Sequence, residues 1–201
     1  MLDARLRPLI DPPLNAAGRW LAARGAGANA ITLTAMVLAI AAAWTISEAH
    51  YLAGLALILT NRLFDGLDGA VARQRGMTDF GGYIDIVGDF VFYVAVPVGF
   101  ALAADENLLP ALVLVASFAL TGVSFLAFAT LAAKRGIETT AHGRKSFFYN
   151  TGLAEGTETI LAFTAMCLLP QYFAPIAWIY AALCLVTVLQ RSLAAHAAFN
   201  D

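Results

Sequence analysis

The stretch Asp65-Gly66-Leu67-Asp68-Gly69-Ala70-Val71-Ala72-Arg73, followed by Gly81-Gly82-Tyr83-Ile84-Asp85-Ile86-Val87-Gly88-Asp89, places four carboxylates in a chain that is 60% hydrophobic and only 13% charged. Asp65 and Asp68 are three residues apart, and Asp85 and Asp89 are four apart. On two helices each pair therefore shares one face. If the chain reverses near Met77, residue 65 pairs with residue 89 and residue 68 with residue 85, so all four acids converge.

Four anions at the edge of a membrane need compensating cations, because each costs about 2.5 to 3.5 kcal/mol at a helix centre and less near the interface. Hard oxygen ligands favour Mg²⁺ or Mn²⁺. Two such ions can clamp a phosphoryl group. Gly66 and Gly69 would let a ligand approach the helix backbone, and Arg73 could fork onto a phosphate. The pattern predicts phosphoryl-type transfer; a purely structural alternative pairs the acids with Arg62, Arg73 and Arg75.

The composition excludes a soluble domain: the 201 residues have a mean hydropathy of +0.74. We predict an all-α integral membrane protein with six transmembrane helices, because each span needs ~20 apolar residues. Residues 1–28, which Pro12-Pro13 interrupts, are expected to form an amphipathic interfacial segment. Residues 29–201 are expected to form the six-helix transmembrane catalytic domain. The predicted spans are about 30–47, which Asn29 would cap, 51–74, 81–103, 109–133, 152–169 and 176–195.

Positive charge supports this topology. With the N-terminus in the cytoplasm, every lysine and arginine falls in an inner segment or at the inner end of a helix. These residues are Arg5, Arg7, Arg19, Arg24, Arg62, Arg73, Arg75, Lys134, Arg135, Arg144, Lys145 and Arg191. We therefore expect both termini and the acidic motif at the cytoplasmic face of the membrane. The cysteines Cys167 and Cys184 lie in apolar runs and are expected to be core or lipid-facing side chains.

The spacing Asp65-x2-Asp68-Gly69-x2-Ala72-Arg73, then Gly81-x3-Asp85-x3-Asp89, resembles the signature of the CDP-alcohol phosphotransferases. One departure is that seven residues separate Arg73 from Gly81, where the common pattern has eight. The resemblance implies a membrane enzyme that moves a phosphatidyl group from CDP-diacylglycerol to a small alcohol and releases CMP. It also implies six spans, a leading amphipathic helix and a homodimer.

The same resemblance assigns roles to individual residues. Two Mg²⁺ or Mn²⁺ ions would be bound by Asp65, Asp68, Asp85 and Asp89. Asp89 would also be the general base for the acceptor hydroxyl. The CDP moiety would be contacted by Asn29, Thr32, Asp65, Gly69, Ala72, Arg73 and Thr78.

The acceptor side is less determined. Arg144 and Lys145 could hold an acceptor phosphate or serve as ordinary positive anchors at the membrane. Glu155 and Glu158, three residues apart, could bind a polyol, attract a cationic head group, or pair with Arg144 and Lys145. The acceptor remains open among a polyol, a polyol phosphate and an amino alcohol.

Two other functions compete. A divalent-cation transporter or channel would need polar residues through the whole bilayer depth, whereas these acids gather at one end of the helices. A non-catalytic lipid-binding relative would not need all four acids, and here all four are present.

Overall fold

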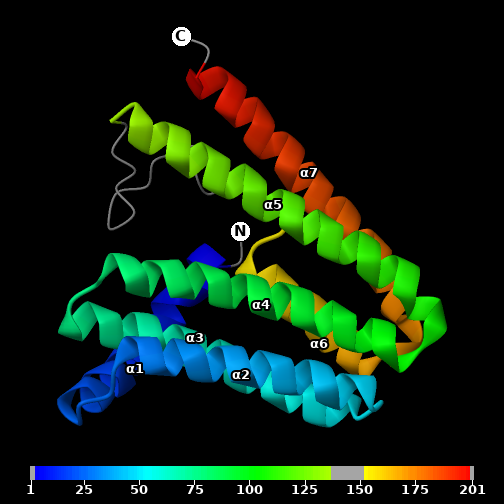
Figure 1. Cartoon of the computed structure of the whole chain (residues 1–201), viewed down its shortest axis with the longest axis horizontal. Coiled ribbons are helices and arrows are strands. Elements are labelled where there is room, and N and C mark those ends of the chain that lie inside the picture. Colours follow the sequence, from blue (N-terminus) through cyan, green and yellow to red (C-terminus); the bar gives the residue numbers. More distant parts are fainter. Residues whose placement is uncertain (1–2, 137–151, 200–201) are drawn as a thin grey trace.

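The computed structural model describes residues 3–136 and 152–199, which are almost entirely helical (Figure 1). The helices are α1 (Asp3–Ala23), α2 (Ala28–Ser47), α3 (Tyr51–Arg75), α4 (Asp79–Ala103), α5 (Leu108–Lys134), α6 (Gly156–Leu168) and α7 (Phe173–Phe199). Short 3-10 helices, η1 (Asp105–Asn107) and η2 (Pro170–Tyr172), precede α5 and α7. The six helices after α1 lie where the sequence predicted six spans.

Helix α2 lies between the two helices that carry the acids. Both α3 and α4 pack along α2 and approach each other far less closely. On the other side of α4, α5 packs against α7, and α6 contacts both α3 and α7 (Figure 1). The α2–α3, α4–α5 and α6–α7 connections lie at one end of the bundle, opposite the α3–α4 turn.

A single apolar core joins α2 to α7. It includes the fully buried side chains Phe92, Phe100, Phe163 and Phe173 from three helices. The Phe100 ring stacks on Phe173 with centroids 4.5 Å apart. Cys167 and Cys184 are free and buried in this core, as the sequence predicted.

In the part of the chain that the structure describes, four helical segments are long and apolar enough to cross a membrane: Ala28–Ser47, Asp79–Ala103, Asp105–Lys134 and Pro170–Phe199. Helix α3 carries the acidic motif, and α6 has 13 residues, about 20 Å, which is shorter than the hydrocarbon core of about 30 Å. The prediction of a multi-span helical protein is confirmed, but within residues 3–136 and 152–199 four of the six expected spans meet the length and hydropathy requirement.

Helix α1 differs from the interrupted segment that the sequence predicted. It continues through Pro12-Pro13 and packs against α3. A Cβ on Gly18 would lie 2.6 Å from the Ala70 Cβ, and a Cβ on Gly66 would lie 2.8 Å from a methyl of Leu14. The space beside Gly66 is therefore filled by Leu14 and not, as the sequence had predicted, by a ligand.

Candidate active site

The turn between α3 and α4 brings the two acidic stretches together. It lies at Gly76 to Thr78, as expected, and Gly76 has φ +99°, a conformation that favours glycine. The Thr78 hydroxyl accepts a hydrogen bond from the Gly81 backbone N–H at 3.0 Å and so caps the N-terminus of α4. The acids consequently sit at matching depths on two antiparallel helices.

Three of the four predicted metal ligands form a compact cluster. Carboxylate oxygens of Asp65, Asp68 and Asp85 lie within 4.8 Å of one another. Asp68 is buried and Asp85 exposed, so one side of the cluster faces outward. The Thr32 hydroxyl donates a 2.7 Å hydrogen bond to Asp68 Oδ2 and holds that carboxylate in place. Three oxygen donors from two helices fit a divalent cation such as Mg²⁺ or Mn²⁺.

Asp89 lies beside this cluster and contacts an arginine. Arg62 Nη1 donates to Asp89 Oδ1 at 2.9 Å and lies 3.6 Å from Asp65 Oδ2. Arg62 thus lies between Asp65 of α3 and Asp89 of α4, while carboxylate oxygens of Asp68 and Asp85 lie within 4.8 Å of each other in the cluster. This is the cross-helix pairing that the spacing predicted.

The structural alternative paired the four acids with Arg62, Arg73 and Arg75. Of these three arginines, Arg62 alone forms ion pairs with the acids. Arg73 Nη2 donates to Asn15 Oδ1 of α1 at 2.9 Å. Arg75 Nη1 donates to the carbonyl oxygens of Gly25 and Ala26. Asn15 is a contact that sequence reasoning missed, because no local pattern links residues 58 positions apart.

The surface next to Arg73 is open. A Cβ added at Gly69 would meet only Arg73 Nη1, at 3.4 Å, so the absence of a side chain there leaves room for a ligand. Ala72 is half-buried on the same helix, and its carbonyl oxygen accepts the Gly76 N–H that ends α3. These positions suit a nucleotide contact, which stays a prediction.

The remaining predicted CDP contacts also have structural partners. Helix α2 begins at Ala28 with Gly27 as its N-cap and no side-chain cap hydrogen bond, so the capping role expected for Asn29 is wrong. The Asn29 Oδ1 instead faces Gly81, where an added Cβ would lie 3.3 Å away. Thr32 contacts Asp68, as described above. Asn29 and Thr32 thus lie beside the start of α4 and the acid cluster.

On the acceptor side, Arg144 and Lys145 lie outside the described residues. Glu155 is the N-cap residue of α6 and Glu158 lies in its first turn, where the helix dipole favours negative charge. The segment before α6 is fixed by Thr187 of α7, whose hydroxyl accepts from the N–H groups of Leu153 and Ala154 at 3.1 and 3.0 Å. Sequence reasoning had not singled out Thr187.

The sequence is similar to that of two known proteins. The chain is 49% identical over 192 residues to the inner membrane protein YnjF of Escherichia coli K12, covering 95% of this chain and 93% of that protein. It is 30% identical over 101 residues to the archaetidylinositol phosphate synthase of Pyrococcus horikoshii, covering 49% of this chain and 53% of that enzyme.

The fold matches solved structures of the Mycobacterium tuberculosis phosphatidylinositol phosphate synthase PgsA1. The complex with manganese and citrate gives a TM-score of 0.65 at 23% identity, covering 90% of this chain and 88% of that one. The complex with CDP-DAG bound gives a TM-score of 0.65 at 20% identity, covering 91% and 93%. Residues 26–190 match the family model for CDP-alcohol phosphatidyltransferases, and the chain belongs to that family.

Proposed function

We propose that this protein transfers a phosphatidyl group from CDP-diacylglycerol to a small alcohol and releases CMP. The observation that carries the proposal is the convergence of Asp65, Asp68 and Asp85 within 4.8 Å, in a chain that belongs to this family. The same fold binds CDP-DAG in the M. tuberculosis synthase, which supports the choice of donor.

The carboxylates suit a divalent cation, Mg²⁺ or Mn²⁺, and manganese is present in one structure of the M. tuberculosis relative. We propose two ions, with Asp65, Asp68, Asp85 and Asp89 as the protein ligands. When bound, such ions neutralise negative charge on the diphosphate and on the departing nucleotide.

The chain's own residues then perform the remaining tasks. Asp89 takes the proton from the acceptor hydroxyl. The hydroxyl oxygen forms a bond to the phosphorus that carries the diacylglycerol, and the bond from this phosphorus to the bridging oxygen of CMP breaks. CMP leaves with that oxygen. Arg73, beside the open surface at Gly69, binds a phosphate of the nucleotide, and Asn29, Thr32, Ala72 and Thr78 line its pocket.

The acceptor is proposed to bind near Glu155 and Glu158, together with Arg144 and Lys145. Two relatives are synthases of inositol phosphate lipids, so polyol phosphates are the first acceptors to test, ahead of free polyols and amino alcohols.

The same proposal includes six spans, both termini and the acidic motif at the cytoplasmic face, and a homodimer. The orientation is supported by Arg75 and Lys134, the last residues of α3 and α5, and by Arg24, which directly follows α1. The C-terminal ends of α1, α3 and α5 lie at the end of the bundle that holds the α3–α4 turn (Figure 1). The multi-pass character agrees with the E. coli relative, an inner membrane protein.

The decisive experiment incubates the purified protein with CDP-diacylglycerol, Mg²⁺ or Mn²⁺ and a panel of alcohols and alcohol phosphates. CMP release and the lipid product are followed together. We expect Asp89→Asn to retain CDP-diacylglycerol binding and to lose transfer by about a hundredfold or more. Near-normal turnover of this variant would remove Asp89 as the base. Absence of CMP release from the wild type with every acceptor would contradict the proposed function.

A further inference from the structure

Arg62 joins the two helices of the candidate site. It lies on α3, one turn before Asp65, and its side chain is only 13% exposed. Nη1 donates to Asp89 Oδ1 on α4 at 2.9 Å, and the same nitrogen lies 3.6 Å from Asp65 Oδ2. A single guanidinium therefore bridges one carboxylate from each helix.

The guanidinium is also held by groups other than the acids. Its Nε donates to Asn61 Oδ1 at 2.7 Å. Asn61 is 1% exposed, and its Nδ2 donates to the Ala35 carbonyl of α2 at 2.6 Å. Because that carbonyl can only accept, the amide nitrogen of Asn61 must face α2, which leaves the amide oxygen for Arg62.

The ring of Phe92 completes this support. The Arg62 Cζ lies 3.9 Å from the centroid of the Phe92 ring, and Phe92 is fully buried in the core. A planar guanidinium stacked on an aromatic face and hydrogen-bonded at Nε has a fixed orientation. The orientation of Arg62 is therefore set by α2 and the core as well as by the carboxylates.

We propose that Arg62 is the positioning residue for Asp89, an inference that rests on the proposed function. By engaging Oδ1, Arg62 fixes the carboxylate and leaves Oδ2 available to the proposed metal ion and to the acceptor hydroxyl. Positioning of this kind affects the rate strongly, because a displacement of about 1 Å can cost about a hundredfold.

The positive charge of Arg62 has a second effect, on divalent cations. The guanidinium lies against Asp65 and Asp89, two of the proposed metal ligands, and repels a cation bound there. Loss of the charge should thus weaken transfer while it strengthens metal binding. A role in folding alone would instead weaken both, because a distorted site binds metal poorly.

The test compares Arg62→Gln and Arg62→Lys in the full chain, with Arg24→Gln as the control. Arg24 also stacks on an aromatic ring, that of Trp20, but it is exposed in the connection between α1 and α2. Mn²⁺ binding is titrated by electron paramagnetic resonance without lipid substrate. CMP release is measured with CDP-diacylglycerol and the acceptor identified by the panel.

We expect Arg62→Gln to lower kcat about tenfold to a hundredfold, with little change in the KM for CDP-diacylglycerol, and to tighten Mn²⁺ binding about fivefold or more. Arg62→Lys keeps the charge but loses the contacts with Asn61 and Phe92, so Mn²⁺ affinity should stay near that of the wild type while kcat falls. In an Asp89→Asn background, Arg62→Gln should lower kcat no further.

Weaker Mn²⁺ binding in Arg62→Gln, an unchanged kcat, or additive losses with Asp89→Asn would each overturn the positioning role. A wild-type protein that binds Mn²⁺ but releases no CMP would instead contradict the proposed function. The two failures are therefore distinguishable, because Mn²⁺ binding is measured independently of turnover.

Discussion

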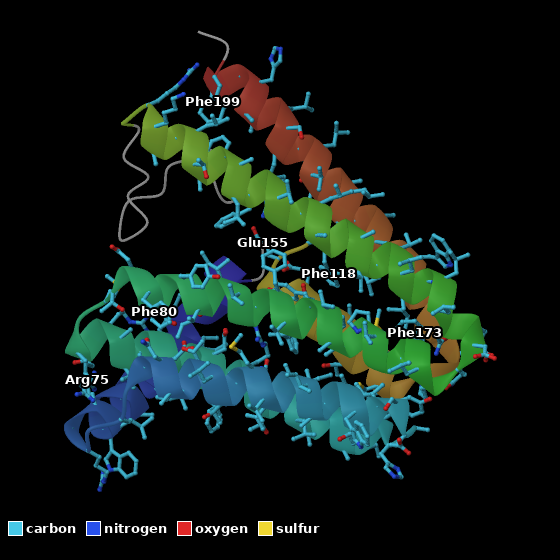
Figure 2. All side chains as sticks on the ribbon, in the orientation of Figure 1. Arg75, Phe80, Phe118, Glu155, Phe173 and Phe199 are labelled. Carbon is cyan, nitrogen blue, oxygen red and sulfur yellow. The ribbon has the colours of Figure 1, made fainter. Side chains whose placement is uncertain are left out.

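The two ends of the α3–α4 pair differ in what holds them together. Figure 2 shows Arg75 and Phe80 at the acidic end, and Phe173 at the opposite, aromatic end. At the acidic end, carboxylates converge and contacts are hydrogen bonds and ion pairs such as that of Arg62 with Asp89. At the aromatic end, Tyr51 stacks on Phe100 with centroids 5.7 Å apart, and Phe100 stacks on Phe173.

This difference separates stability from chemistry along the same two helices. Like charges brought together at the acidic end oppose folding, whereas buried rings at the aromatic end favour it. Changes at the acidic end should therefore alter function more than stability, and changes at the aromatic end should do the reverse. Five substitutions test this contrast.

The largest effect is expected for Asp68→Asn. Asp68 is 4% exposed and its carboxylate lies in the acid cluster, so the substitution removes a proposed metal ligand while relieving repulsion from Asp65 and Asp85. We expect transfer to fall about a thousandfold or more, equivalent to about 4 kcal/mol, without a loss of thermal stability. CMP release and a melting curve measure the two quantities. A variant that retains a tenth of the activity would remove Asp68 from the metal site.

At the aromatic end, Phe100→Ala should act on stability. Phe100 is fully buried between Tyr51 and Phe173, and its truncation should lower the free energy of unfolding by about 3 to 5 kcal/mol. Leu102→Ala is the control, because Leu102 is on the same helix but 72% exposed. Thermal unfolding in detergent checks this, and activity per folded molecule should stay near normal. Equal melting temperatures for the two variants would contradict the assignment of stability to this end.

A pair of glycine substitutions sharpens the contrast. A Cβ on Gly99 would lie 2.6 Å from the Ala43 carbonyl oxygen of α2, so Gly99→Ala should destabilise the protein by about 1 to 3 kcal/mol. Gly69→Ala meets only the end of Arg73 and should raise stability by up to about 1 kcal/mol through helix propensity. The same substitution should raise the KM for CDP-diacylglycerol. Unfolding measurements on both variants test whether the two changes in stability have opposite signs, and initial rates give the KM. A Gly99→Ala protein as stable as the wild type would argue against close α2–α4 packing.

The smallest effect is expected for Asn15→Ala. The variant loses a hydrogen bond to Arg73 of about 1 kcal/mol, so the KM for CDP-diacylglycerol should rise about fivefold while kcat is unchanged. Initial rates over a range of donor concentrations separate the two parameters. A change confined to kcat would show that Asn15 does not act through nucleotide binding.

The sequence by itself determined the helices, their order and the reversal near Met77, because hydrophobic runs and glycines act locally. It also determined the cross-helix pairing of Asp65 with Asp89 and of Asp68 with Asp85, since helical spacing alone puts each pair on one face. The family followed from the same spacing. Two local predictions were wrong: the interruption of the first helix at Pro12-Pro13 and the helix cap at Asn29. At these places the packing of α1 on α3 and the α1–α2 linker set the helix boundaries.

Only the tertiary structure decided which partner each polar side chain takes. Arg62 reaches Asp89, Thr32 reaches Asp68, and Asn15 reaches Arg73, across 27, 36 and 58 residues. In the sequence, several arginines and acids were equally plausible partners, because charge and residue type do not specify where a side chain points. Where each side chain points is set by the packing of α1 on α3 and of α2 on α3 and α4. That packing exists only in the folded chain.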